Sequence, residues 1–112
     1  MNMHATAAHD WCQADGANVH LPIPRSQEEN DLYNSVFASL NENAFWLGIN
    51  DADSEGQWKT FQGDTQTYFD WGSSEPAGTT ATWDYVYSSK ITGKWHNIYD
   101  ATDATAICTY II

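Results

Sequence analysis

Apolar residues in the first part of the chain recur at helical spacing. Ala5, Ala8 and Cys12 fall on one side of a helix that would cover roughly residues 4–14. Gly16 follows at a place that suits the left-handed residue found after many helix C-termini. The pattern therefore predicts a first helix that ends shortly before Gly16.

A second helix is predicted to begin at Ser26, after an extended connector with two prolines, HLPIP. Ser26 and Glu29 have the spacing of a capping box, in which each side chain accepts a hydrogen bond from an otherwise unpaired amide at the helix N-terminus. One apolar stripe follows along this helix, and we expect it to face the core. Its members are Leu32, Tyr33, Val36, Phe37 and Leu40.

After Asn43 the pattern changes to short runs typical of strands, rich in aromatic and β-branched residues. The runs are AFWLGI, QWKTF, WDYVYSS, GKWHNIY and ATAICTYII. Alternation along GKWHNIY would place Trp95 and Asn97 on one face and His96 on the other. A long segment rich in Gly, Ser, Thr and Asp covers residues 62–83, and such loops in compact domains are usually functional or disordered. Helices followed by strands predict an α+β fold, with residues 1–112 as a single domain.

Charge excludes several classes of partner. The formal net charge is -11, and the chain contains only four basic residues besides its histidines. A nucleic-acid partner needs a cationic surface, and an anionic membrane attracts basic segments, so both are disfavoured. No apolar run approaches the roughly 18 residues of a membrane span, and residues 1–15 lack the features of a signal peptide. The surplus carboxylates serve either solubility or cation binding.

The two cysteines, Cys12 and Cys108, lie near opposite ends of the chain. An even pair fits a disulfide in a secreted protein, and two buried free thiols are the alternative. A disulfide that closes a loop of about 100 residues is worth at most roughly 4.7 kcal/mol in the chain-entropy model. His9 lies three residues before Cys12, but a Cys–His nucleophile also needs an orienting third group, which the sequence does not offer. We therefore expect no enzymatic activity.

The segment DADSEG resembles the start of an EF-hand loop. Its first, third, fifth and sixth positions are Asp51, Asp53, Glu55 and Gly56. The twelfth position is Gln62 instead of the bidentate glutamate that the motif needs, and the flanks are predicted strands. The segment is therefore either a polar turn or part of a calcium site that takes ligands from elsewhere in the chain.

Taken in order, the motifs resemble those of the C-type lectin-like domain. They are GAN, SQEEND, FWLGINDADSEGQW, WGSSEP, GKWHN and AICTY, and they cover essentially the whole chain. The resemblance implies two helices that flank small antiparallel sheets, a long ligand-binding loop, an extracellular location and a first strand that is missing or truncated. It also implies a disulfide between Cys12 and Cys108.

The chain departs from the family in its second disulfide, whose cysteine positions correspond to Tyr85 and Asp100. The resemblance thus implies a divergent member whose long loop lacks a covalent clamp. Trp83 and Tyr85 are expected to hold the loop by packing instead.

The primary calcium and sugar site of the family maps onto a weakened set of residues. The loop glutamate is Glu75, but the next ligand position is Ala77, and a later glutamate position is Trp83. The two strand ligands become His96 and Asn97. Calcium takes about six to eight oxygen ligands, so the resemblance implies a degraded primary site. A histidine nitrogen suits zinc better than calcium.

A second, structural calcium site of the family maps onto Asp51, Glu55, Gly78 and Asp84. Three carboxylates remain there, so Ca²⁺ is a possible cofactor. The function implied is an extracellular ligand-binding module that takes a glycan through the long loop, with ligand-binding candidates Glu75, Trp83, His96 and Asn97. The alternative is a calcium-independent domain that binds a protein or another surface.

Overall fold

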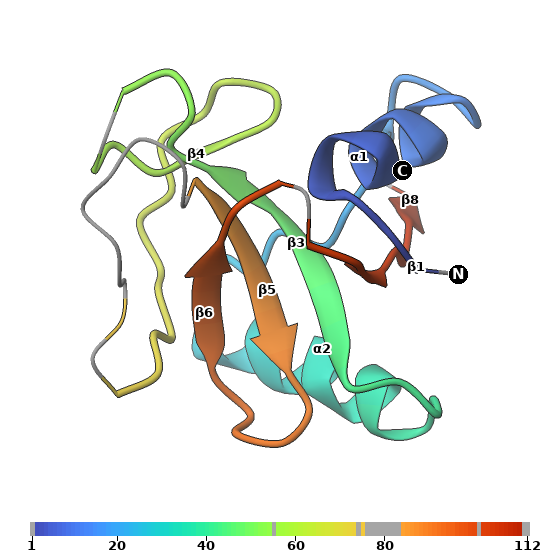
Figure 1. Cartoon of the computed structure of the whole chain (residues 1–112), viewed down its shortest axis with the longest axis vertical. Coiled ribbons are helices and arrows are strands. Elements are labelled where there is room, and N and C mark those ends of the chain that lie inside the picture. Colours follow the sequence, from blue (N-terminus) through green and yellow to red (C-terminus); the bar gives the residue numbers. More distant parts are fainter. Residues whose placement is uncertain (1, 55, 74, 76–83, 101, 111–112) are drawn as a thin grey trace.

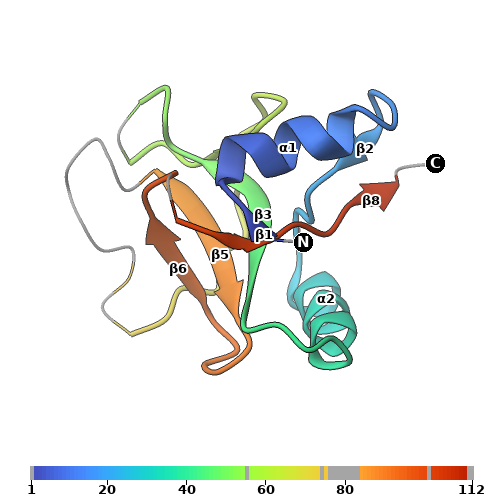
Figure 2. The same ribbon diagram turned by 45° about the vertical axis from the view of Figure 1, so that its right-hand side comes forward.

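The computed structural model describes residues 2–54, 56–73, 75, 84–100 and 102–110, which form an α+β fold (Figure 1). The elements in chain order are β1 (Asn2–Met3), α1 (Ala5–Gln13), β2 (Val19–His20), α2 (Gln27–Ala38), β3 (Ala44–Asn50), β4 (Lys59–Thr60), β5 (Tyr85–Ser89), β6 (Trp95–Ile98), β7 (Ala104–Thr105) and β8 (Thr109–Tyr110). In Figure 2 the sheet of β3, β5 and β6 lies to one side, and α1 and α2 lie apart at the top and bottom of the molecule.

The main sheet has the strand order β1-β7-β3-β5-β6, with β4 paired to β3, and β2 pairs with β8 in a second sheet. The pairs are antiparallel except β3 with β7, which is parallel at Phe45 and Thr105. The predicted C-terminal strand is therefore two strands in different sheets. The chain leaves the main sheet after Thr105 and pairs again with β2 from Thr109. The structure joins Cys12 of α1 to Cys108, which lies in that crossing segment.

Helix α1 has the predicted buried face of Ala5, Ala8 and Cys12. Its N-cap residue, His4, makes no side-chain cap hydrogen bond. Asp100 fills that role from the far end of the chain, because its Oδ1 accepts a hydrogen bond from the Thr6 amide at 2.8 Å. A carboxylate at a helix N-terminus satisfies an unpaired amide and interacts favourably with the helix dipole.

Helix α2 begins as predicted, but its buried face differs from the predicted stripe. Ser26 Oγ accepts from the Glu29 amide, whereas the Glu29 carboxylate accepts from the amide of Arg25 and not from that of Ser26. Of the stripe, Phe37 is buried and Tyr33 half-buried, and three members are exposed: Leu32, Val36 and Leu40. The prediction that all five face the core is wrong, because the buried residues of α2 are Asn30 and Phe37. Leu32 and Val36 lie four residues apart on a different, exposed side of the helix, and Leu40 follows after the helix has ended.

Two buried tryptophans centre the two parts of the core. Trp46 on β3 lies in a cluster with the apolar residues of α1, β2 and β7, and its Nε1 donates to the Met3 carbonyl at 2.7 Å. Trp95 on β6 packs with Leu47, Ile49 and Val86. Successive side chains of a strand point to opposite faces, so β3 supplies residues to both clusters.

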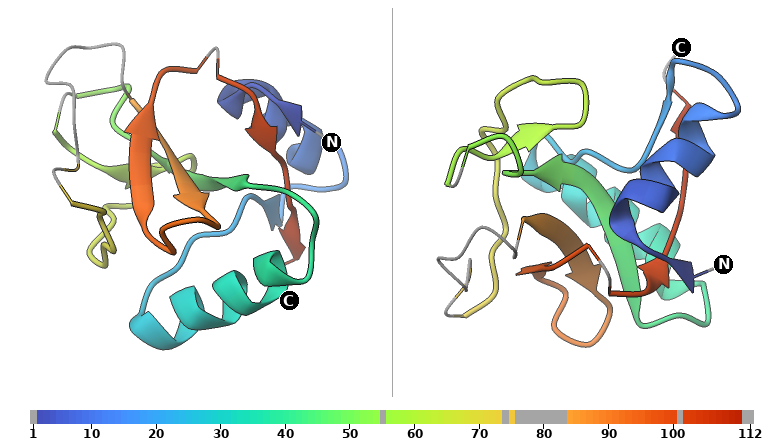
Figure 3. Two further views of the ribbon diagram at one scale, coloured as in Figure 1. Left: turned by 60° about the horizontal axis from the view of Figure 1, so that its bottom comes forward. Right: turned by 45° about the horizontal axis from the view of Figure 1, so that its top comes forward.

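The loop that follows β4 lies at the edge of the molecule away from the chain termini, beside β6 (Figures 1 and 3). Trp83 of the predicted site and Glu55 of the predicted metal set lie outside the described residues, as do Ala77 and Gly78. Within the described part of the chain, no helix is long and apolar enough to cross a membrane.

Candidate ligand-binding site

Strand β6 alternates as its sequence predicts. Trp95 and Asn97 are buried, and His96 is half-buried on the other face. The indole Nε1 of Trp95 donates to Asn30 Oδ1 at 2.9 Å, and Asn30 Nδ2 donates to Asp70 Oδ2 at 2.8 Å. A buried indole N–H needs such a partner, so this chain of contacts fixes both the strand and the start of the loop.

The loop docks on β6 through backbone groups of Asp70 and Gly72. The Trp95 amide donates to the Asp70 carbonyl, and the Gly72 amide donates to the Trp95 carbonyl, both at 2.9 Å. The Glu75 amide then donates to the Gly72 carbonyl, which closes a turn. This turn carries the Glu75 side chain to the exposed face of β6.

Glu75 and His96 meet there. Glu75 Oε2 lies 2.8 Å from His96 Nδ1, and the two side chains are only 11% and 20% exposed, respectively. His96 Nε2 lies 2.9 Å from the hydroxyl of Thr92. A carboxylate can only accept, so Nδ1 donates to Glu75, and in neutral histidine Nε2 then accepts from Thr92. Both imidazole nitrogens therefore have partners.

Packing fixes the imidazole of His96 on two sides. Its ring stacks on Tyr87, with centroids 5.3 Å apart and planes 24° apart. A Cβ added at Gly72 would lie 2.8 Å from His96 Cε1, closer than real contacts allow. Glycine at position 72 thus lets the loop backbone approach the ring. Burial, and then the negative charge of Glu75, raise the pKa of Tyr87.

Two of the predicted metal ligands, Asp51 and Asp84, lie where β3 ends and β5 begins. Asp51 is 2% exposed, and its amide donates to the Asp84 carbonyl at 3.0 Å, which joins the two segments. Asp51 Oδ2 accepts from the Gly56 amide, but Oδ1 is buried without a hydrogen-bond partner among the described residues. A buried carboxylate oxygen without a partner is costly, and a bound cation would remove that cost.

Carboxylates also surround Tyr85, the residue that follows Asp84. Burial is the main cause that raises the pKa of Tyr85, and four carboxylates add to it. In decreasing order of effect they belong to Asp100, Asp84, Asp53 and Asp51. The negative potential at this end of the sheet favours a cation.

Several residues of these sites escaped the sequence analysis. Asn30 looked like an ordinary residue of an exposed helix face, and Thr92 and Gly72 like ordinary turn residues. The sequence contains no signal for Gly72 beyond its place in the glycine-containing segment 62–83. Nothing in the sequence pairs Thr92 with His96.

Comparison with known proteins identifies the family. A model of the "Lectin C-type domain" matches residues 1–110. The chain belongs to the C-type lectin family. Its members are binding modules, and a long loop beside a Trp-containing strand is what the resemblance had led us to expect.

Two relatives set the scale of the similarity. A tetranectin-like protein of Carcharhinus perezii is 36% identical over 108 residues, which are 95% of this chain and 64% of the relative. C-type lectin domain family 3 member A of Mus musculus is 31% identical over 111 residues, which are 97% of this chain and 56% of the relative. The chain thus spans less than two thirds of the length of either relative.

Solved structures of other proteins share the fold. The C-type lectin CEL-I of Cucumaria echinata superposes with a TM-score of 0.87 at 21% identity, over 99% of this chain and 86% of that one. A calcium-independent type II antifreeze protein gives a TM-score of 0.80 at 19% identity, over 99% and 82% of the two chains. These similarities establish the architecture of two helices and small sheets.

The two calcium positions of the C-type lectin family differ in how their residues fit a cation. Glu75 contacts the imidazole of His96, whose other nitrogen contacts the Thr92 hydroxyl, and this is a poor set for an ion that prefers about six to eight oxygen ligands. At Asp51 a buried carboxylate oxygen lacks a hydrogen-bond partner among the described residues, which fits a cation better. Among the described residues, no group of three or more His, Cys, Asp or Glu side chains could hold a metal ion, and Glu55 lies outside them.

Proposed function

We propose that this C-type lectin domain is an extracellular ligand-binding module that takes a glycan at the surface of the long loop and β6 without calcium at the primary site. The observation that carries the proposal is the 2.8 Å contact between Glu75 and His96. Glu75, Trp83 and His96 are the residues assigned to this surface, with Trp83 assigned from its sequence position alone. Asn97, the fourth candidate from the sequence, is buried on the opposite face of β6 and does not reach this surface.

The Glu75–His96 contact substitutes for a metal as the link between loop and strand. A calcium ion would join the two segments through shared oxygen ligands, whereas here a carboxylate and an imidazole join them directly. The contact is mostly shielded from water, which strengthens it. A loop that is already positioned loses less entropy when it binds a ligand.

The test is a glycan array run in calcium and again in EDTA, with three variants at matched concentration. Binding should be the same in both buffers, and Glu75→Gln and His96→Phe should each weaken it. Glu28→Gln, an equal charge change on the exposed first turn of α2, should leave it unchanged. Glycan binding that EDTA abolishes would contradict the proposal.

The alternative function is calcium-independent recognition of a protein through the same surface. The formal net charge of -11 favours a basic partner, since charge complementarity speeds association. An array without any glycan signal, together with binding to a basic protein partner that Glu75→Gln weakens, would select this alternative.

We also propose that Asp51 and Asp84, with Glu55, hold a structural calcium ion. The buried Oδ1 of Asp51 supports this assignment, because it lacks a partner among the described residues. Calcium at about 100 times its Kd should stabilise the fold by roughly 2.7 kcal/mol. Thermal unfolding should show a higher Tm in calcium that EDTA reverses and that Asp51→Asn removes. No shift at millimolar calcium would refute the site.

A further inference from the structure

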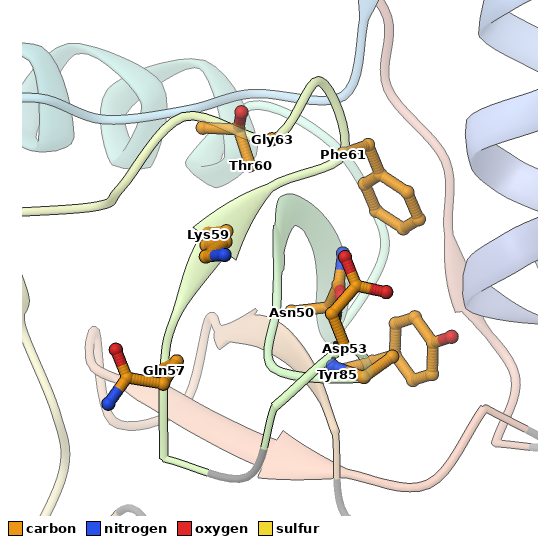
Figure 4. Close-up of a pocket in the computed structure, with 9 residues that line it drawn as sticks. Asn50, Asp53, Gln57, Lys59, Thr60, Phe61, Gly63 and Tyr85 are labelled. Carbon is orange, nitrogen blue, oxygen red and sulfur yellow. Dashed lines mark hydrogen bonds between the residues drawn. The ribbon is translucent and has the colours of Figure 1, made fainter.

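A second pocket lies at the end of the sheet where β3, β4 and β5 meet, and it shares no residue with the loop site. Its volume is about 230 Å³. The side chains that matter for its chemistry are Asn50, Asp53, Gln57, Lys59, Phe61 and Tyr85. Figure 4 shows Phe61 and Tyr85 on one side with the Asp53 carboxylate beside them, and Gln57 on the opposite side.

Two opposite charges line this pocket and do not neutralise each other by contact. Lys59 and Asp53 both face it, yet among the described residues neither forms an ion pair. The charges of the lining itself, one ammonium and one carboxylate, balance, and the other carboxylates that act on Tyr85 disfavour an anionic ligand. Lys59 is one of four basic residues in a chain with a formal net charge of -11.

The remaining polar groups offer both donors and acceptors. Asn50 Oδ1 accepts from the Ala52 amide, which directs the amide oxygen to the backbone and leaves its NH₂ group to donate. Gln57 is exposed and carries one donor group and one acceptor. A hydroxyl both donates and accepts, so adjacent hydroxyls can satisfy a carboxylate and an ammonium together.

Aromatic rings form the apolar side of the pocket. The rings of Phe61 and Tyr85 stack with centroids 6.1 Å apart, and Phe61 also stacks on His9 of α1 at 4.1 Å. Contacts on both sides of Phe61 hold the ring in place before any ligand arrives. The pocket is smaller than the roughly 300–1,000 Å³ of drug-sized sites, so it suits one small ring.

We propose that this pocket is a second, metal-independent saccharide subsite that takes one neutral sugar residue. Neighbouring hydroxyls of the sugar donate to Asp53 and accept from Lys59, and its apolar C–H face packs against the Phe61 and Tyr85 side. The inference rests on the proposed glycan-binding function but concerns a separate surface.

The experiment is an NMR titration of the ¹⁵N-labelled domain in EDTA with the methyl glycosides of galactose, glucose, mannose and N-acetylglucosamine. At least one glycoside should shift the amides of residues 50–53, 57–61 and 85. Asp53→Asn and Lys59→Gln should each weaken that binding at least about tenfold, because each removes a charge-assisted hydrogen bond. Asp10→Asn, the same charge change on the exposed surface of α1, should not.

Each other outcome counts against the subsite. Shifts confined to Glu75, His96 and their neighbours would place all sugar binding at the loop and overturn this inference while leaving the proposed function intact. The absence of shifts at the pocket with every glycoside, or equal binding by Asp53→Asn and the unmodified domain, would also overturn it. Shifts at the pocket with glycine but with none of the sugars would show a site for zwitterions instead.

Discussion

The two tryptophan-centred halves of the core are secured in different ways. Around Trp46, a disulfide joins α1 to the crossing segment before β8, across a sequence separation of 96. Around Trp95, no covalent link occurs among the described residues, and side-chain hydrogen bonds from Asn30 and Asp70 hold helix, loop and strand together. The proposed loop site belongs to the second half.

This difference indicates where the domain can change its contacts. Breaking the Glu75–His96 contact removes the side-chain link between Glu75 and β6, whereas the backbone hydrogen bonds of Asp70 and Gly72 with the buried Trp95 remain. Local opening of this kind costs less than global unfolding, and binding surfaces are commonly drawn from such regions. The half around Trp46 provides the fixed frame against which the loop can adjust.

Removal of the disulfide should have the largest effect and would test whether the Trp46 half depends on it. The double variant Cys12→Ser/Cys108→Ser should lose about 2–5 kcal/mol of unfolding free energy, because it frees a long loop in the unfolded chain. Urea denaturation of the oxidised domain and the variant measures the loss. A loss below about 0.5 kcal/mol would show that the Trp46 half, like the Trp95 half, is stabilised by hydrogen bonds and packing and not by the disulfide.

Asn30→Ala should be the most damaging single change in the Trp95 half. It leaves the indole N–H of Trp95 unpaired in the core and removes one partner of Asp70. We expect a loss of roughly 2–3 kcal/mol, since each unsatisfied buried group costs about 1–3 kcal/mol. Urea denaturation again measures it, with the exposed Asn43→Ala as the control. Equal stability of the two variants would refute the role assigned to Asn30.

Asp100→Ala should have a smaller effect, and it sharpens the comparison because Asp100 lies where the resemblance places a cysteine of the second disulfide. The variant loses the cap of α1, a change worth about 1 kcal/mol. Hydrogen exchange at the Thr6 amide should accelerate, whereas Asp103→Ala, at an exposed neighbour, should leave it unchanged. Unchanged exchange in Asp100→Ala would contradict the capping role.

The smallest expected effect is a pH dependence that arises in the Trp46 half. Burial lowers the pKa of His9 from 6.5, while Asp10 raises it and His20 lowers it. The unfolded chain therefore takes up the proton first as the pH falls, so stability decreases as the pH drops through 6.5. His9→Phe should reduce this decrease, and His4→Phe should retain it. Equal pH profiles of Tm for His9→Phe and the unmodified domain would exclude His9 as the source.

Local patterns predicted most of the fold. The α1 face, the start of α2 and the alternation in β6 follow from spacing that involves only neighbouring residues. The predicted buried face of α2 was wrong because a periodicity argument treats every apolar residue as a candidate for the core. Asn30 occupies the core through hydrogen bonds to Trp95 and Asp70, and those partners are distant in sequence.

For the proposed loop site, the sequence predicted which two segments come together but not the contacts between them. The motifs placed Glu75 and His96 at the same surface, but their hydrogen bond depends on how far the loop folds over β6. The loop can come this close because Gly72 has no side chain. Thr92, in the turn before β6, contacts the second imidazole nitrogen of His96. The pocket beside β3, β4 and β5 could not be predicted from the sequence. Lys59 and Tyr85 come to line it together only when β3 has paired with both β4 and β5.

The link between Cys12 and Cys108 also determines what happens when the backbone is cut. A protease that cleaves after the exposed Lys90 produces two pieces, and the disulfide keeps them in one molecule. Such a nicked domain would migrate as a single band on a non-reducing gel and as two fragments after reduction. A preparation that looks intact without reductant can therefore contain broken chains.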